Sequence, residues 1–491
     1  MWRVWQYRFR RTTLVTVLYL AFLAGIGLAH VGSSAWLTRI WPAAVVLLTL
    51  SRHRTMLSLF LAALLGLGLG CWHGAVFMQK LAVSQSYYYS EVTISARAMD
   101  DAVYGTKSQL SFDANDVVLD NGTALAGKIE LSGFGENAIF QGDEVTATGK
   151  LYPGYGAYQG RISFAELQVT VHHPSLVPEV RRRFTAGMQT ALPEPLAPFA
   201  MGLLIGQRAT LPANVKQDLL MVGLTHIIAV SGYNLTIILH ASRRLLARQS
   251  KRLSTALSFG LIAVFLLLAG ASASIVRAAI VSTLSIIASY YGRSFQPVNL
   301  LALVAAITVW ANPFYLWSDV SWYLSFLAFF GVMVVSPLVQ ARWPGRWHQT
   351  IVGGVALESV CAELMSLPFI LYIFGQMSFI GLPANVLVVA LVPLAMLLST
   401  IAGLAGMLSG PVAGWLAWPA WAFLNYMLDI AHWMAHLPHV FVQNLSLPLA
   451  GLMGLYGVVG FITVMLWHRT KRSRRDIITD MNELETGGLG T

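Results

Sequence analysis

Long apolar runs separated by short polar turns constrain the fold of this chain more than any other feature. A helix needs about 20 mostly apolar residues to cross a bilayer. Only 11% of the residues are charged, whereas soluble proteins carry about 25%. The sequence therefore predicts a polytopic α-helical membrane protein with about twelve spans, near residues 12–31, 35–50, 55–78, 223–241, 254–272, 274–291, 297–311, 320–339, 350–373, 381–407, 412–436 and 446–467.

Three of these runs depart from a simple transmembrane helix. Residues 35–50 contain Arg39 and Pro42, and the run 297–311 is short. The stretch from Pro383 to Pro393 favours a broken or re-entrant helix, because proline removes helical hydrogen bonds.

Basic residues gather in alternate short loops and at both ends of the chain, while the intervening short loops hold none. This distribution is the positive-inside pattern, which sets membrane topology. Most of the net charge of +10 is explained in this way. The pattern predicts a multi-pass protein of a bacterial cytoplasmic membrane, with the N-terminus and the C-terminus inside.

Residues 80–173 change character after three predicted spans and are expected outside the membrane. Apolar and polar residues alternate there, as in half-buried strands. The alternation covers 92–98, 110–114, 145–151 and 162–171, with turns expected at 120–122, 133–135 and 141–143. Five or six short strands of this kind predict a small sandwich or an OB-like barrel, and periodicity alone leaves both open.

Residues 174–222 follow as amphipathic helices broken by prolines. The apolar stretch Pro198–Arg208 is too short to span, so we expect it on or in the outer membrane face. The predicted organisation is a three-helix membrane segment at 1–79, an extracytoplasmic all-β OB-like insert at 80–173, interfacial helices at 174–222, a polytopic domain at 223–467 and a basic, then polar, tail at 468–491.

A series of short motifs runs in order through the chain. They read GLLIG at 202–206, GLTHIIAVSG at 223–232, SIVRAA at 274–279, NP at 312–313, WYLSFLA at 322–328, LP at 367–368, FGQ at 374–376 and PAN at 383–385. In this order they resemble the signatures of the ComEC family, the competence-associated DNA-uptake channels. Tyr233-Asn234 stand where that family usually has Leu-His.

The resemblance implies a channel that carries single-stranded DNA across the cytoplasmic membrane during natural transformation. It also implies a DNA receptor, a cytosolic ATPase and single-strand-binding proteins as partners, and a homo-oligomer as the assembly. Many family members end in a metallo-β-lactamase-like domain with the motif HxHxDH, which is not found up to Thr491. We therefore predict no enzyme activity and no cofactor, and a separate nuclease for the strand that is not imported.

Charged and polar residues in the apolar part are candidates for the channel path. A charge in a span is costly and usually faces a cavity or a partner. Arg277 would contact phosphate in a wet path, or snorkel to the interface, or pair with Glu358 or Glu363. A helix break at Ser231-Gly232 would form a gate, or a helix-packing site. The path candidates are His226, Ser231, Gly232, Asn234, Arg277, Asp319, Glu358, Glu363 and Asn385.

A second group of candidates would meet DNA at the outer face. Residues 80–173 hold six basic and eleven acidic residues, so this insert is no strong electrostatic DNA trap. It could still stack bases on tyrosines. The outer-face candidates are Tyr152, Tyr155 and Tyr158 of the insert and Arg181, Arg182, Arg183, Arg208 and Lys216 beyond it; membrane lipid is the alternative partner of the cations.

Asp429, His432 and His436 lie on one face of a predicted helix, and the two histidines have a metal-ligand spacing. No fourth ligand is evident in the sequence, so no metal site is predicted. A polar helix end near the outer interface, in a stretch rich in Trp and His, is the favoured explanation of the pattern.

Two other classes of function stay open. A small-solute or ion transporter would use Arg277 with Glu358 and Glu363. A polytopic enzyme on lipid-linked substrates would need an acid–base pair, and only His226 with Ser231 lies close in sequence. The chain has no P-loop motif for ATP.

Overall fold

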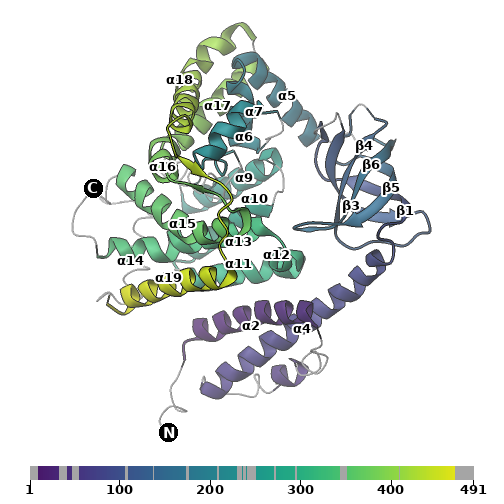
Figure 1. The fold of residues 1–491 in the computed structure, drawn as a ribbon, viewed down its shortest axis with the longest axis vertical. Helices are drawn as coiled ribbons and strands as arrows, with labels where there is room; N and C mark the ends of the chain where they lie inside the picture. Colours follow the sequence, from purple (N-terminus) through teal and green to yellow (C-terminus); the bar gives the residue numbers. More distant parts are fainter. Residues whose placement is uncertain are drawn as a thin grey trace. The chain divides into compact units, whose positions relative to one another are not determined.

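The computed structural model describes residues 9–32, 41–46, 55–104, 109–136, 138–172, 176–206, 210–228, 235, 239, 250–269, 273–293, 296–342, 351–408 and 410–469. The chain divides into two compact units (Figure 1). Unit 1 comprises Met1–Glu179 and Val298–Tyr323, and unit 2 comprises Val180–Pro297 and Leu324–Thr491.

Unit 1 begins with two helices that pack closely, α2 (Arg11–Val31) and α4 (Met56–Gln85). Glycines permit this approach, since a Cβ atom on Gly70 would lie 2.2 Å from the carbonyl oxygen of Phe22. Small residues let helices meet backbone to backbone, which is how apolar helices pack in a membrane. Helix α4 continues to Gln85, so the first residues of the predicted β insert are helical.

The β domain of unit 1 has six strands, and its sheet closes on itself (Figure 1). The strands are β1 (Glu91–Ala98), β2 (Val103–Tyr104), β3 (Leu110–Leu119), β4 (Lys128–Phe134), β5 (Glu144–Pro153) and β6 (Tyr158–Val171). Their order is β1-β5-β6-β4-β3-β2, and β1 also pairs with β3. Among the strand pairings of the described residues, β4 with β6 is the parallel one. The ring of pairings favours the barrel over the sandwich.

The predicted alternation in the strands is confirmed. In β1, Val92, Ile94, Ala96 and Ala98 are buried and their neighbours are more exposed. The turn expected at 133–135 was wrong at its start, because Gly133 belongs to strand β4 and pairs with Leu110 of β3. A Cβ atom there would lie 2.0 Å from the carbonyl oxygen of Ala165, so glycine serves a close approach of strands and not a turn.

Unit 1 also contains α11 (Pro297–Ala311), α12 (Phe314–Trp317) and the beginning of α13 (Val320–Phe330). Asp319 caps α13, since its Oδ1 accepts from the backbone N–H groups of Ser321 at 2.8 Å and Trp322 at 3.3 Å. An acidic cap satisfies backbone donors that a helix start leaves open.

The described part of unit 2 is a helical assembly with one short pair of strands, β7 (Met377–Ser378) and β8 (Phe441–Val442). Its helices are α5 (Leu176–Ala191), α6 (Leu196–Ile205), α7 (Ala213–Met221), α9 (Lys251–Ala269), α10 (Ala273–Tyr290), the π-helix η2 (Gly331–Val335), α14 (Ser336–Gln340), α15 (Ile351–Phe374), α16 (Gly381–Val389), α17 (Val392–Leu408), α18 (Gly410–Ala435) and α19 (Leu449–Arg469).

Helix α6 lies at the centre of unit 2, and all ten of its residues are buried. The sequence prediction for this stretch, a short apolar segment on or in the outer membrane face, stays a prediction; the structure shows that other parts of unit 2 cover the helix. A helix that is apolar on every side is usually buried in a protein core or spans a membrane. Helix α6 has only ten residues, too few to span, and other helices bury it. Helix α5 lies against α17 through Gly187, whose carbonyl oxygen would be 1.9 Å from a Cβ atom on Gly406.

Five helical stretches among the described residues are long and apolar enough to cross a membrane. They are Arg11–Val31, Met56–Gln85, Val320–Gln340, Ala356–Phe374 and Leu449–His468. Helices α16 and α17 together form a further candidate, bent by 47°, which confirms the predicted break after Pro383. The protein is thus a polytopic membrane protein, and the count of about twelve spans stays a prediction, partly because most of 35–50 and 223–241 lies outside the described residues.

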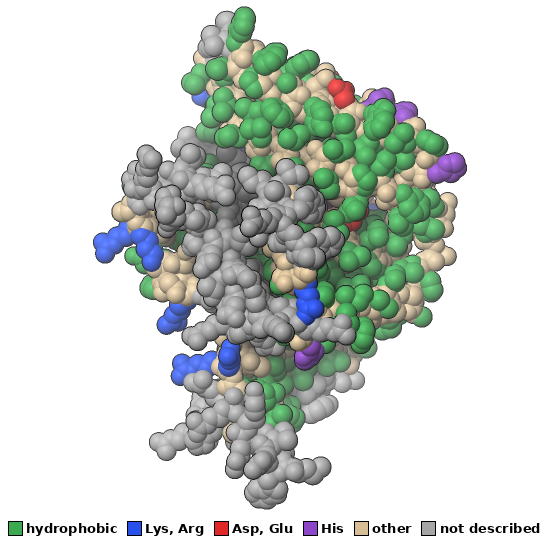
Figure 2. Space-filling view, turned by 90° about the vertical axis from the view of Figure 1, so that its left-hand side faces the viewer, with side chains coloured by type: hydrophobic (Ala, Val, Ile, Leu, Met, Phe, Trp, Pro, Cys, Tyr) green, Lys and Arg blue, Asp and Glu red, His purple; other side chains and the backbone are tan. Residues whose placement is uncertain are grey.

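The outer surface of the helices of unit 2, α18 and α19 among them, carries many large apolar side chains. Figure 2 shows hydrophobic side chains over much of the described surface on one face. Large side chains point outward, for example Trp415, which is 85% exposed, and Phe461, which is 70% exposed. Such extended apolar surface is unfavourable in water and suits contact with lipid.

Candidate functional site

Three motif-bearing segments that are far apart in the sequence meet inside unit 2, together with Glu363 on α15. Gly202 on α6 faces the segment that follows α7, since a Cβ atom there would lie 2.5 Å from Ile228 Cγ2. Gly223 has φ +76°, and its Cβ would lie 3.4 Å from Ser378 Cβ and 3.6 Å from Gly381 Cα. We call this meeting of 202–206, 223–228 and 377–385 with Glu363 the motif junction.

A polar pair lies in the motif junction between two helices. Asn385 on α16 donates from Nδ2 to Glu363 Oε2 on α15, at 3.2 Å. Asn385 is only 6% exposed, and Glu363 Oε1 would be 3.0 Å from a Cβ atom on Gly381. Glycine at 381 therefore leaves room for the carboxylate, and two predicted path residues come together here.

Two buried oxygens in the motif junction, Ser378 Oγ and Asn385 Oδ1, have no hydrogen-bond partner among the described residues. Buried polar atoms normally have partners, either in the protein or in ordered water. The motif junction therefore offers hydrogen-bond acceptors inside an otherwise apolar helical assembly.

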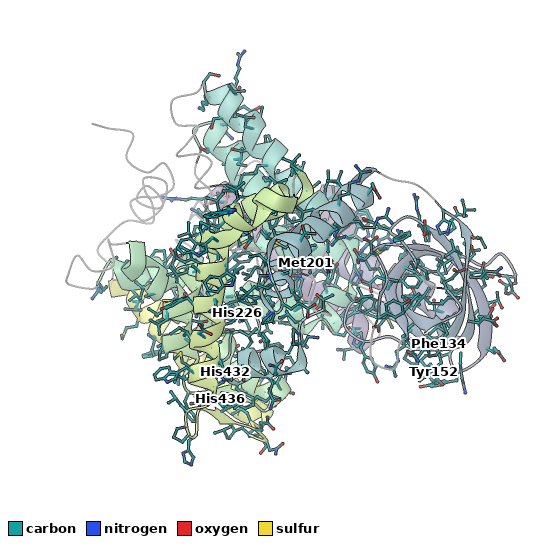
Figure 3. The ribbon with its side chains drawn as sticks, turned by 90° about the horizontal axis from the view of Figure 1, so that it is seen from above. Phe134, Tyr152, Met201, His226, His432 and His436 are labelled. Atoms are coloured by element: carbon teal, nitrogen blue, oxygen red, sulfur yellow. The ribbon has the colours of Figure 1, made fainter. Side chains whose placement is uncertain are left out.

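His226 lies at the edge of the motif junction and is exposed (Figure 3). Its Nδ1 lies 3.1 Å from the carbonyl oxygen of Gly223. Because a carbonyl oxygen can only accept, Nδ1 is the donor. This bond leaves Nε2 as the acceptor of a neutral ring. Four other predicted residues lie outside the described residues: Arg208, Ser231, Gly232 and Asn234.

The remaining path candidates lie on different elements. Arg277 on α10 is 1% exposed and is the largest fully buried side chain of the described residues. This burial argues against snorkelling to the membrane interface, one of the alternatives for this residue. Glu358 is half-buried on α15, about one and a half helical turns before Glu363. Asp319 caps α13 in unit 1 and is not part of the motif junction.

A second polar feature lies on the β domain, at the hairpin formed by β5 and β6. Tyr152 on β5 is paired with Arg161 on β6. The Arg161 guanidinium carbon lies 4.9 Å from the ring centre of Tyr155 and 5.9 Å from that of Tyr152. Lys150 Nζ lies 5.9 Å from the Tyr152 ring. We call these four residues the aromatic–basic cluster, and Figure 3 labels its Tyr152 at the edge of the β domain.

The aromatic–basic cluster combines two properties that unpaired nucleic acid can use. Tyr155 is 70% exposed, so one ring is open to stacking, and bases stack on aromatic side chains without sequence preference. Arg161 and Lys150 supply positive charge next to the rings, in a domain that is acidic overall.

Tyr158 is the third predicted tyrosine, and it has a different environment. Its hydroxyl donates to Asp113 Oδ2 at 2.9 Å. Burial raises the pKa of the Asp113 carboxyl above its ordinary value, and burial together with the Asp113 charge raises the pKa of the Tyr158 phenol. The Tyr158 hydroxyl is thus bound to a carboxylate on β3, and the structure brings Tyr152 and Tyr155 together without Tyr158.

The tip of the β5–β6 hairpin is fastened to the helical part of unit 1. Asn312 Nδ2 donates to the carbonyl oxygen of Ala157 at 3.1 Å, and Ser318 Oγ donates to that of Gly156 at 2.5 Å. Asn312 belongs to the NP motif at 312–313, and its Oδ1 also accepts from the Phe314 N–H at 3.0 Å. This role of Asn312 was missed in the sequence, because nothing local links it to residue 157.

The basic residues beyond the β domain are placed on two helices of unit 2. Arg181 and Arg182 on α5 are half-buried and Arg183 is exposed, while Phe184 and Met188 of the same helix are buried. Lys216 on α7 is half-buried. The amphipathic character predicted for α5 is thus observed, with cations on the side away from the core.

Comparison with known proteins identifies the family. The family model described as "Competence protein" matches residues 203–469, more than half of the chain. The chain belongs to the competence protein family. The match contains the motif junction from Leu203 onward, whereas the aromatic–basic cluster lies before it.

One curated relative supports the ComEC assignment of this competence-family protein. The chain is similar to ComE operon protein 3 of Bacillus subtilis (strain 168), with 24% identity over 226 residues. The aligned part covers 46% of this chain and 28% of that relative, so the similarity spans less than a third of the relative's length. No solved structure matches the chain. The family resemblance carried by the sequence motifs is confirmed.

Proposed function

We propose that this competence-family protein is a channel that carries single-stranded DNA across the cytoplasmic membrane during natural transformation. The observation that supports this most directly is the motif junction. Its segments come from four separate stretches of the chain, and nearly all of it lies in the part that the family model matches. Motif residues that converge in a polytopic protein mark a shared site better than the same residues scattered.

In the proposal, the path runs through the helical unit 2 past polar side chains. Glu363 and Asn385 supply a hydrogen-bonded pair, and His226 stands exposed beside it. Arg277 supplies a buried positive charge for phosphate, with Glu358, Ser231, Gly232 and Asn234 as further path residues. Asp319 acts on the path through the helix that it caps. No covalent chemistry is required of these groups.

The β domain would receive the strand at the outer face. Its closed order and its one parallel pair, β4 with β6, support an OB-like barrel, a fold that binds oligonucleotides. Tyr152 and Tyr155 would stack bases, and Arg161 and Lys150 would lie near the phosphates. Tyr158, Arg181, Arg182, Arg183, Arg208 and Lys216 are further proposed contacts, the cations either to DNA or to lipid headgroups.

The topology and the partners are part of the same proposal. Both termini lie in the cytoplasm, residues 80–173 lie outside, and residues 223–467 form the polytopic channel domain, following the charges of the loops. Energy comes from a cytosolic ATPase, DNA comes from a receptor, and single-strand-binding proteins receive it. A separate nuclease degrades the other strand, and the channel works as a homo-oligomer.

The test is the uptake of labelled DNA into a DNase-protected compartment of the host. The strains are a deletion strain and the same strain complemented with wild type, Arg277→Ala, or Asn385→Asp. A matched control is Gly260→Ala, because a Cβ atom at Gly260 on α9 meets nothing within 4 Å. Membrane levels of each variant are compared by immunoblot, and surface-bound DNA is measured in parallel.

The proposal requires that deletion abolishes protected DNA, that wild type and Gly260→Ala restore it, and that surface binding is equal in all strains. Reduced uptake by Arg277→Ala at normal protein level would assign this charge to the path. Unchanged uptake on deletion would refute the channel, and solute transport through the same polar residues would then be the better hypothesis.

A further inference from the structure

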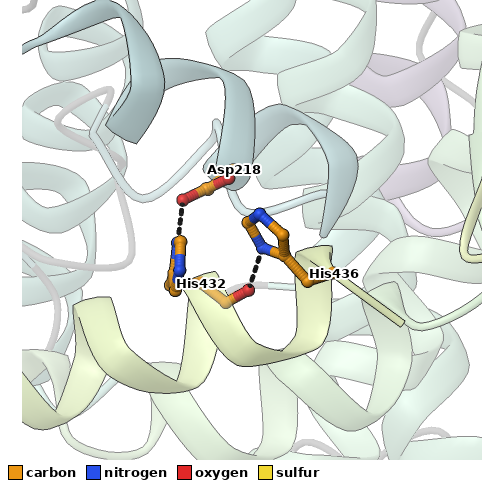
Figure 4. A group of neighbouring side chains, drawn as sticks. All are labelled: Asp218, His432 and His436. Atoms are coloured by element: carbon orange, nitrogen blue, oxygen red, sulfur yellow. Dashed lines mark hydrogen bonds and ion pairs between the residues drawn. The ribbon is translucent and has the colours of Figure 1, made fainter. Parts of the chain in front are cut away.

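Two helices of unit 2 bring three metal-ligating side chains together at the protein surface. Asp218 lies on α7, and His432 lies near the end of α18 with His436 directly beyond it. One ligand atom from each of the three lies within 4.8 Å of the other two. Figure 4 shows both imidazole rings extending from the end of α18 toward Asp218 on α7. We propose that these residues bind a divalent transition-metal ion of the zinc type.

The hydrogen bonds of His436 prepare it for this role. Its Nδ1 is 2.8 Å from the carbonyl oxygen of His432. Since a carbonyl only accepts, Nδ1 carries the proton and Nε2 presents a lone pair. Histidines that bind metals usually donate from their other nitrogen to a carbonyl or carboxylate, which fixes the ring and its tautomer.

His432 and Asp218 provide the other two ligands. His432 Nδ1 lies 2.7 Å from Asp218 Oδ2. An ion between them replaces this hydrogen bond with two metal bonds, and the ring proton moves to Nε2. Ligand atoms in a tetrahedral zinc shell are about 3.3 Å apart, given bond lengths near 2.0–2.1 Å. Metal binding therefore lengthens the distance between His432 Nδ1 and Asp218 Oδ2 slightly. The ligand nitrogen of His436, now within 4.8 Å of the other two ligand atoms, moves closer to them.

The exposure of these groups permits that adjustment. The His432 side chain is 67% exposed and that of Asp218 is 16% exposed. An ion can thus reach the site from solvent, and the rings can turn without disturbing the core. Two imidazoles and one carboxylate favour zinc, cobalt or nickel over magnesium or calcium, which prefer oxygen ligands alone. Water would complete the shell.

Asp429, the acid that the spacing on the helix pointed to, has a different partner. Its Oδ2 accepts from Asn425 Nδ2 at 3.0 Å, one turn earlier on α18. The acidic ligand comes instead from α7, at a separation of 214 residues from His432. Asp429 is therefore a matched control, because it is an acid on the same helix near the same histidines.

The consequence of binding is a tie between two helices. Helix α7 ends at Met221, directly before the 223–228 segment of the motif junction. An ion held by α7 and the end of α18 would fix this segment from outside. The site does not depend on the proposed DNA channel, because metal binding is measured without DNA.

The experiment uses the full chain in detergent, purified with an affinity tag that contains no histidine. Zn²⁺ binding is measured by calorimetry, and Co²⁺ is used as a visible probe of tetrahedral coordination. The variants are Asp218→Asn, His432→Gln and His436→Gln, with Asp429→Asn as the control. Melting of each metal-free variant shows that it is folded, and exposed His436 keeps the test valid if another variant unfolds.

We expect one Zn²⁺ per wild-type chain and per Asp429→Asn chain. Each of the three ligand variants should lose at least about tenfold in affinity together with the Co²⁺ spectrum, because even the loss of an outer-shell partner of a ligand typically costs about 10–100-fold. Equal binding by wild type and all three ligand variants would overturn the proposal, and so would the absence of Zn²⁺ binding by wild type. Neither result would bear on DNA uptake.

Discussion

Replacing Tyr155 by alanine removes the exposed ring of the aromatic–basic cluster, and its effect can be worked out from the structure. Tyr155 lies at the hairpin tip and is 70% exposed, so its truncation leaves no cavity and costs little stability. What it removes is a stacking surface next to the Arg161 guanidinium, whose central carbon is 4.9 Å from the ring centre.

The magnitude follows from the stacking of a single base. One base on one aromatic ring contributes about 1–3 kcal/mol, which corresponds to a loss of about 5- to 150-fold in affinity. Arg161→Gln should weaken binding through charge, and it should reduce the salt slope by about 0.7 for single-stranded DNA. Tyr155→Ala should leave that slope unchanged, because tyrosine neutralises no phosphate.

The assay is fluorescence anisotropy of a labelled oligothymidine with the purified full chain at several fixed salt concentrations. Tyr104→Ala is the control, since this tyrosine is 57% exposed on β2, which among the described strands pairs with β3 and not with the β5–β6 hairpin. Affinity that is unchanged in Tyr155→Ala, or lowered as much in Tyr104→Ala, would refute the assignment of the aromatic–basic cluster to DNA.

Three further predictions concern packing, the polar pair and pH. Gly202→Ala should destabilise the protein by about 1–3 kcal/mol in detergent melting, because the added Cβ would lie 2.5 Å from Ile228 Cγ2. The control Gly260→Ala should leave stability unchanged, and equal melting temperatures of the two variants would contradict the close approach at Gly202. Asn385→Asp places a second acid beside Glu363 and should lower the free energy of unfolding by about 1–3 kcal/mol. Adding Glu363→Gln should restore stability, because residue 363 then donates the hydrogen bond and residue 385 accepts it. A double variant as unstable as Asn385→Asp alone would count against this hydrogen bond. Burial raises the pKa of Asp113 above 3.8, so the native state binds this proton more tightly than the unfolded chain, and stability from this group falls as pH rises from about 4 upward. Asp113→Asn should flatten that fall in melting curves between pH 4 and 7, and an unaltered pH profile would show that the group does not titrate in this way.

The sequence predicted features that depend on local pattern. Alternation in 92–98 gave the correct face of β1, and apolar length gave α2, α4 and α19. The bend between α16 and α17 followed from the prolines near 383 and 393. In each case the signal is the chemistry of consecutive residues, which the final packing leaves unchanged.

Features that depend on distant partners could not be predicted in this way. The spacing on α18 identified His432 and His436, but Asp218 enters only because α7 packs against that helix. The apolar stretch of α6 reads the same whether lipid or protein covers it, and the structure shows protein. Glycine is needed at 381 because the Glu363 carboxylate on another helix lies close to it.

The β domain is attached to the helices of unit 1 at two places. At its entry, Tyr88 just after α4 donates from its hydroxyl to the carbonyl oxygen of Gln159, and Gln159 Nε2 donates to Ser84 Oγ on α4. At the hairpin tip, Asn312 and Ser318 hold the backbone of residues 156 and 157.

A domain tied at one point can swing in all directions, whereas one tied at two points can only rock about the line that joins them. The two attachments therefore restrict the directions in which the barrel can move Tyr152 and Tyr155. Removal of the second attachment by Asn312→Ala together with Ser318→Ala should leave the barrel folded but free to swing about its entry, so the DNA binding proposed for its tyrosines would persist while the direction of delivery would be lost.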